Sequence, residues 1–109
     1  MKDAHIFLTG ATGFLGKVVL EELMRRQDEL GVQKVYLLIR DRGDIRAEER
    51  FLTSVLTSPC FDRLHEGWED AVEVVRGDLA VPGCGIDYDA REMLRKRVTH
   101  VIHSAASVE

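Results

Sequence analysis

Apolar residues occur along the chain with two kinds of spacing. Short apolar runs typical of buried strands lie at residues 5–8, 34–40, 72–75 and 99–103. Stretches with apolar residues at helical spacing lie between them, at residues 14–29, 47–56 and 89–97. The run from Val35 to Ile39 is apolar throughout, which indicates a strand covered on both faces. The pattern predicts four strands separated by three helices.

Turn-forming residues mark the ends of these helices. Gly31 follows the first helix, at the position where glycine most often ends one. Pro59 ends the second, because the residue before a proline avoids helical backbone angles. Asp89, with Glu92 three residues later, predicts a capping box at the start of the third helix.

Strands that alternate with helices are typical of an α/β fold with a parallel sheet. We predict a Rossmann-type parallel sheet with helices on both faces, partial, with about four strands in the order 3-2-1-4. The length of 109 residues suits one small domain, residues 1–109.

A glycine-rich turn separates the first strand from the first helix. Gly10 would let the chain turn, Gly13 would let a ligand approach the backbone, and Gly16 would let the helix pack closely. The start of a helix presents unpaired N–H groups and the positive end of the helix dipole, which together bind anions. The spacing, GxxGxxG, favours a dinucleotide diphosphate site. The alternative is a tight turn that holds nothing.

The end of the second strand bears on the choice of cofactor. Sites for NAD usually place an acidic residue there to accept from the ribose 2′-OH, whereas sites for NADP place an arginine near the 2′-phosphate. Arg40 stands at this position, and its planar guanidinium suits a phosphate. Asp41 follows at once and leaves NAD as the alternative. We predict NADPH.

Three further positions carry two readings each. Asp78 follows the third strand and would either reach the adenine or form a turn after Gly77. Ala105 and Ala106 end the fourth strand, where small residues would leave room for a ring or sugar, or form a plain turn. His100 and His103 alternate with apolar residues and are interpreted as structural.

Composition and charge narrow the class of protein. The net charge of −4 and the scattered basic residues argue against a nucleic-acid partner. Cys60 and Cys84 are too few for a disulfide framework or a metal site, and no metal cluster is expected. No apolar run approaches the ~20 residues of a membrane span, and the N-terminus does not resemble a signal peptide. A cytoplasmic protein is expected.

The segments TGATGFLG (9–16), GDL (77–79) and HSAAS (103–107) together resemble the extended short-chain dehydrogenase/reductase superfamily. Longer stretches, VYLLIR, AEERF and SPCFDRL among them, are similar to the N-terminal part of fatty acyl-CoA reductases and thioester-reductase domains. The resemblance covers nearly the whole chain. It implies that the cofactor diphosphate is surrounded by Thr9, Gly10, Thr12, Gly13, Phe14, Leu15 and Gly16. It further implies that Arg40 faces the 2′-phosphate, Asp78 and Leu79 the adenine, and Ala105 and Ala106 the nicotinamide-side ribose.

The chain departs from this group in lacking its catalytic residues. Members reduce carbonyls with a Tyr-x-x-x-Lys pair, in which tyrosine donates the proton. Tyr36 and Tyr88 are instead followed, four residues later, by Arg40 and Glu92. We therefore expect the cofactor-binding N-terminal segment of a reductase, truncated before its catalytic part, with no catalytic residue of its own.

The resemblance implies a substrate for the full-length parent, either a fatty acyl-CoA or a carrier-bound acyl thioester, reduced to an aldehyde or alcohol. Two alternatives remain: a non-catalytic dinucleotide-binding sensor or scaffold, and another superfamily enzyme such as a sugar-nucleotide epimerase. The fourth strand would form an exposed sheet edge, through which self-association is expected.

Overall fold

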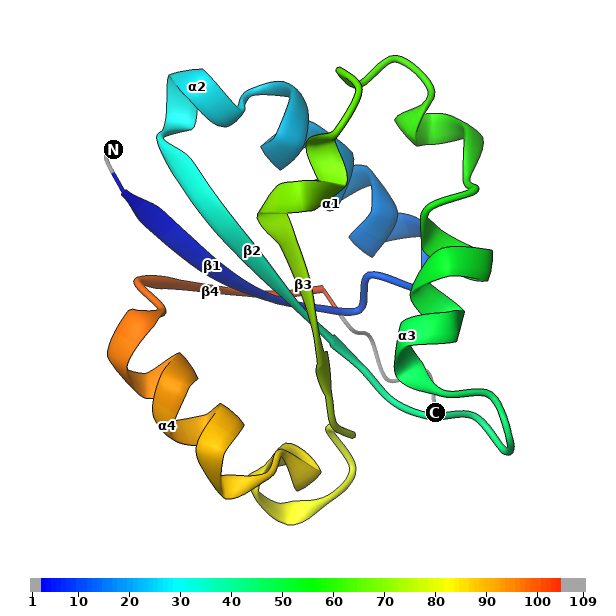
Figure 1. Ribbon diagram of the computed structural model, residues 1–109, viewed down its shortest axis with the longest axis vertical. Helices are drawn as coiled ribbons and strands as arrows, with labels where there is room; N and C mark the ends of the chain where they lie inside the picture. The colour runs from blue at the N-terminus through cyan, green and yellow to red at the C-terminus, as the bar shows by residue number, and fades with distance from the viewer. Residues whose placement is uncertain (1–2, 105–109) are drawn as a thin grey trace.

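The computed structural model describes residues 3–104, and its centre is a parallel sheet with strand order β3-β2-β1-β4 (Figure 1). Its strands are β1 (Ala4–Thr9), β2 (Val32–Ile39), β3 (Val72–Arg76) and β4 (His100–His103). The three pairings β1–β2, β1–β4 and β2–β3 are all parallel. The predicted fold class and strand order are confirmed.

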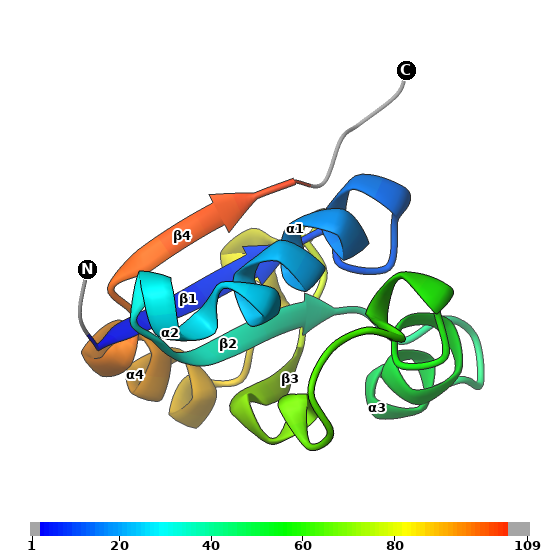
Figure 2. The same cartoon turned by 90° about the horizontal axis from the view of Figure 1, so that it is seen from above.

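Helices cover both faces of this sheet. They are α1 (Phe14–Arg25), α2 (Gln27–Leu30), α3 (Ala47–Arg50) and α4 (Tyr88–Arg97). Figures 1 and 2 show α4 on the opposite face from α1 and α3. Shorter helical turns lie at Phe51–Val55, Pro59–Phe61, Trp68–Ala71 and Pro82–Gly85.

The side chains of β2 form part of two apolar cores. Val35, Leu37 and Ile39 pack into the larger core, beneath α1 and α3. Tyr36 and Leu38 point to the other face and pack with residues such as Leu94 of α4. Because side chains alternate across a strand, an unbroken apolar run supplies both faces. This burial holds the carboxyl end of β2 firmly in the centre of the sheet.

Two helices differ from the expectation. The predicted helix 14–29 is divided at Arg26, although Gly31 ends it as expected, with φ of 69°. In the predicted helix 47–56, the N–H of Leu56 bonds to the carbonyl of Phe51, a wide π turn. Phe51 and Val55 of this segment are buried, while Leu52 is exposed.

The expected capping box at α4 is wrong by two residues. Asp87, not Asp89, caps the helix, because its Oδ1 accepts from the N–H of Ala90 at 2.8 Å. Asp89 lies inside the first turn of the helix, where its carboxylate faces the positive end of the helix dipole instead.

β4 forms one edge of the sheet within the described residues, since it pairs only with β1 there. Val101 of this strand is 67% exposed. Self-association through this edge stays a prediction. Among residues 3–104, no helix has the length and apolar character needed to span a membrane.

Candidate cofactor-binding site

The glycine turn after β1 brings α1 close to the strand end. Gly10 has φ of 85°, a left-handed conformation that side chains rarely adopt, and its carbonyl accepts from the N–H of Gly13. A Cβ on Gly16 would lie 1.9 Å from the carbonyl oxygen of Gly10. Gly16 is therefore required for α1 to cross directly over the turn.

The N-terminus of α1 is open at this turn. Its N-cap is Gly13, and no side chain among residues 3–104 caps the helix with a hydrogen bond. A Cβ on Gly13 would meet only the carbonyl oxygen of Gly10, at an ordinary 3.5 Å. Phe14, the first residue of the helix, is 85% exposed, and Leu15 is also exposed. Within the described residues, the first N–H groups of α1 therefore have no side-chain partner, which suits the binding of an anion such as a diphosphate.

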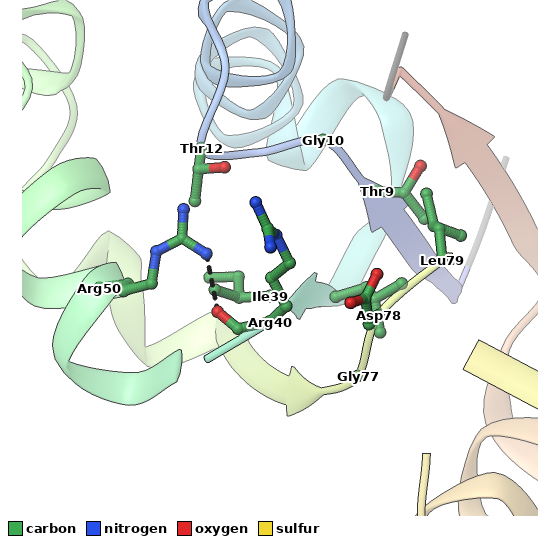
Figure 3. A pocket seen from close by; sticks show the side chains of 10 residues that line it. Thr9, Gly10, Thr12, Ile39, Arg40, Arg50, Gly77, Asp78 and Leu79 are labelled. Carbon is green, nitrogen blue, oxygen red and sulfur yellow. Dashed lines mark hydrogen bonds between the residues drawn. The ribbon is translucent and has the colours of Figure 1, made fainter. Parts of the chain in front are cut away.

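A cavity of about 180 Å³ lies at the carboxyl ends of three strands (Figure 3). Of the twelve predicted site residues, it brings together Thr9, Gly10, Thr12, Arg40, Asp78 and Leu79. Four others lie at the start of α1 and do not line the cavity: Gly13, Phe14, Leu15 and Gly16. The last two, Ala105 and Ala106, fall outside the described residues. In open α/β sheets ligands bind in this position, beyond the carboxyl ends of the strands.

Two arginines line this cavity. Arg40 extends from the end of β2, and Arg50 reaches the same space from α3, so that both guanidinium groups lie near Thr12 in Figure 3. The Nη1 of Arg50 donates to the carbonyl of Arg40 at 2.7 Å. Burial, followed by the positive charges of Arg40 and Arg42, lowers the pKa of Arg50. Two guanidinium groups that line one cavity form a good site for a multiply charged anion.

The sequence pattern did not single out Arg50. It stands within AEERF, a segment that was interpreted as part of a helix and as part of the family resemblance, with no site role given to its arginine. Nothing in the local pattern indicates which way this side chain points, because the loop between β2 and α3 decides it. The spacing of ten residues from Arg40 carries no general signal.

Asp41, the residue that kept NAD as an alternative, is engaged by other groups. Arg76 donates to it from Nε and Nη2, at 3.1 and 2.9 Å. The backbone N–H of Ala47 donates to its Oδ1 at 2.8 Å. The bonds from Arg76 are the largest cause, and that from Ala47 the next, of a pKa for Asp41 that lies below its usual value. Its carboxylate is thus ionised and already has three donors.

Asp78 has the bonds of a turn-forming residue as well as a place in the cavity. Its Oδ1 accepts from the N–H of Ala80 at 2.9 Å, and its own N–H donates to Cys84. A Cβ on Gly77 would collide with that same carbonyl of Cys84, at 2.4 Å. Asp78 also lines a second cavity of about 330 Å³, which shares Arg40 with the first. The assignment of Asp78 and Leu79 to the adenine stays a prediction.

Thr9 is buried at the end of β1, and its hydroxyl faces β4. Its Oγ1 lies 2.7 Å from Nδ1 of His103 in a hydrogen bond, and the N–H of Ser104 donates to its carbonyl. His103 therefore joins the ends of two strands, which agrees with its structural interpretation. Residues 3–104 contain no group of three His, Cys, Asp or Glu side chains that could hold a metal ion.

The four-stranded parallel sheet, the open glycine turn and the cavity at the strand ends define a Rossmann-type dinucleotide-binding domain. The NAD-binding family described as "Male sterility protein" matches residues 8–109. The chain belongs to this family.

The relatives of the chain are reductases by name. Fatty acyl-CoA reductase wat of Drosophila melanogaster is 36% identical over 110 residues, which cover 98% of this chain and 20% of the relative. L-2-aminoadipate reductase of Schizosaccharomyces pombe is 36% identical over 103 residues, or 94% of this chain and 7% of that protein. The chain thus spans about a fifth of the fatty acyl-CoA reductase that it matches.

Two solved reductase domains are also similar to this chain. The terminal R domain from the myxalamid PKS-NRPS biosynthetic pathway superposes with a TM-score of 0.77 at 29% identity, over 100% of this chain and 26% of that one. The reductase domain of a nonribosomal peptide synthetase from Mycobacterium tuberculosis has a TM-score of 0.76 at 34% identity, over 96% and 24%. The predicted resemblance to the N-terminal part of the thioester-reductase group is confirmed.

Proposed function

We propose that this chain binds NADPH and forms the cofactor-binding segment of a reductase that acts on fatty acyl-CoA or carrier-bound acyl thioesters, giving an aldehyde or alcohol. The names of the relatives, fatty acyl-CoA reductases and R domains, support this substrate class. NADPH would supply the hydride when bound. The chain's own residues would bind and orient it.

The observation that carries the choice of NADPH is the pair of guanidinium groups in one cavity. Arg40 and Arg50 place two positive charges at the end of β2, where the 2′-phosphate of a bound adenosine would lie. Arginine suits this role because its planar fork of donors matches the oxygens of a phosphate. The backbone of the Gly10–Gly16 turn would face the diphosphate, and Asp78 with Leu79 the adenine.

The two tyrosines of the chain lie away from this cavity, which supports a cofactor-binding rather than a catalytic role for the residues that line it. Tyr36 is buried in the smaller apolar core, and that burial raises its pKa. Tyr88 is exposed at the start of α4. Neither tyrosine lines the cavity, so neither is placed to donate a proton to a substrate beside the cofactor.

Titration of the full chain with NADPH and NADH tests the proposal. We expect wild type to prefer NADPH, and Arg40→Ala to weaken NADPH binding by roughly tenfold or more, the usual effect of losing a hydrogen bond between charged groups. NADH binding should change little, because NADH lacks the 2′-phosphate. Arg95→Ala, which removes a positive charge from exposed α4, is the matched control. Equal affinities for the two cofactors in wild type would contradict the proposal.

A further inference from the structure

The end of β2 carries two side chains with opposite consequences for the choice of cofactor. Arg40 would attract a 2′-phosphate, whereas Asp41 would repel it and accept a hydrogen bond from a free ribose 2′-OH. Both residues line the second cavity, together with Arg76. The protein therefore needs a means of keeping the carboxylate of Asp41 from the ligand if Arg40 is to select a phosphate.

The sheet supplies that means. Arg76 is the last residue of β3 and pairs in register with Ile39 of β2, so the strand pairing brings its side chain to Asp41. Its Nε and Nη2 each contact a different carboxylate oxygen, at 3.1 and 2.9 Å, which is the bidentate arrangement. A bidentate pair fixes orientation as well as distance.

Asp41 is also tied to the element that carries the second arginine. Its Oδ1 accepts from the N–H of Ala47, the first residue of α3, and Arg50 is the last residue of the same short helix. The carboxylate that Arg76 holds is thus an anchor for the start of α3. One ion pair therefore influences both guanidinium groups: it keeps a negative charge from Arg40, and it helps to hold the helix from which Arg50 extends.

We propose that Arg76 is a positioning residue for cofactor specificity: by holding Asp41, it keeps that carboxylate from pairing with Arg40 where a 2′-phosphate would bind. This inference rests on the proposed binding of NADPH. Without Arg76, the carboxylate of Asp41 is free to pair with Arg40 or to accept from a ribose 2′-OH. Either change disfavours NADPH relative to NADH.

The test uses Arg76→Gln, Asp41→Asn and the double variant in the full chain, titrated with NADPH and NADH. We expect Arg76→Gln to lower the preference for NADPH by roughly three- to tenfold, the effect of one like charge several ångströms from the phosphate. The double variant should regain a preference near that of wild type, because the amide oxygen of asparagine can still accept from the N–H of Ala47 while the side chain carries no charge. A fall that persists in the double variant would overturn the inference.

A matched control is available at the other end of the same two strands. Lys34 of β2 and Glu73 of β3 form an ion pair at 3.6 Å, far from the strand ends that line the cavity. Lys34→Gln removes one positive charge and one pair between β2 and β3, as Arg76→Gln does. It should leave the ratio of the two affinities unchanged. An equal change of the ratio in both variants would mean that Arg76 acts only through net charge, and would overturn the inference.

The outcomes separate this inference from the proposed function. Absence of an NADPH preference in wild type, or no effect of Arg40→Ala, removes the proposed function and the inference with it. If wild type prefers NADPH and Arg40→Ala weakens its binding, but Arg76→Gln leaves the ratio of the two affinities unchanged, the inference alone is wrong. Should Arg76→Gln fail to fold, Asp41→Asn decides, because its preference for NADPH must equal or exceed that of wild type; a lower preference overturns the inference.

Discussion

Arg50 Nη1 donates to the carbonyl oxygen of Arg40 at 2.7 Å, so the second guanidinium of the cavity is held by the backbone that carries the first. This contact means that Arg50 is oriented before any ligand arrives. A preorganised donor loses less side-chain entropy on binding than a free one does.

We therefore predict that Arg50→Ala weakens NADPH binding by about tenfold while leaving NADH binding close to that of wild type. Arg50→Lys should recover only part of the loss, because an ammonium lacks the planar fork. Isothermal titration of both cofactors measures this. An NADPH affinity in Arg50→Ala equal to that of wild type would remove Arg50 from the site.

Gly16→Ala should destabilise the fold. The added Cβ would lie 1.9 Å from the carbonyl oxygen of Gly10, and both atoms belong to rigid backbone. We expect a loss of several kcal/mol in the free energy of unfolding, in the range of severe overpacking. Gly43→Ala is the control, because a Cβ there meets no atom of the described residues within 4 Å and its positive φ costs only about 1–2 kcal/mol. Urea denaturation with equal midpoints for the two variants would contradict the assignment.

Gly13→Ala should have the opposite profile. Its Cβ makes only an ordinary contact at 3.5 Å, and its φ of −89° suits alanine, so the stability should stay near that of wild type. The new methyl group would stand at the open start of α1, where the diphosphate is proposed to bind. We expect weaker binding of both NADPH and NADH, since the two share that group. Unchanged affinities would place the diphosphate elsewhere.

Acid should weaken the contact between Asp41 and its partners. The pKa of Asp41 is lowered in the folded protein, first by Arg76 and then by the N–H of Ala47. Its contribution to stability is therefore present above the unfolded pKa of about 3.9 and is lost as the pH falls through the lower folded value. Asp41→Asn should reduce this acid dependence, which melting temperatures between pH 7 and pH 2 would show. Parallel curves for variant and wild type would contradict it, and high salt should diminish the difference.

Two aspartates at the start of α4 should contribute differently to the free energy of unfolding. Asp87→Ala removes the side-chain oxygen that accepts from Ala90 and should cost about 1 kcal/mol of unfolding free energy. Asp89→Ala should cost less, since Asp89 only faces the helix dipole. Denaturant unfolding of the two variants measures the difference. A larger loss in Asp89→Ala would restore the capping box that the sequence suggested.

The elements themselves could be predicted from the sequence because their signals are local. The apolar run of β2, the glycines after β1 and Gly31 at the end of α2 act through neighbouring backbone, so spacing alone indicates them. Arg40 could be selected in the same way, as the residue at a strand end. The exact bounds of the helices could not be predicted in this way. The π turn at Phe51 depends on packing, and the cap at Asp87 depends on one hydrogen bond.

The electrostatics of the site were decided by the tertiary structure alone. Asp41 meets Arg76 across 35 positions of sequence, and Thr9 meets His103 across 94, because the register of parallel strands brings them together. The sequence determined that Arg40 and Asp41 would both stand at the end of β2. The neighbouring strand decides which of these two charges remains free for a ligand, because β3 holds the side chain of Arg76 at bonding distance from Asp41.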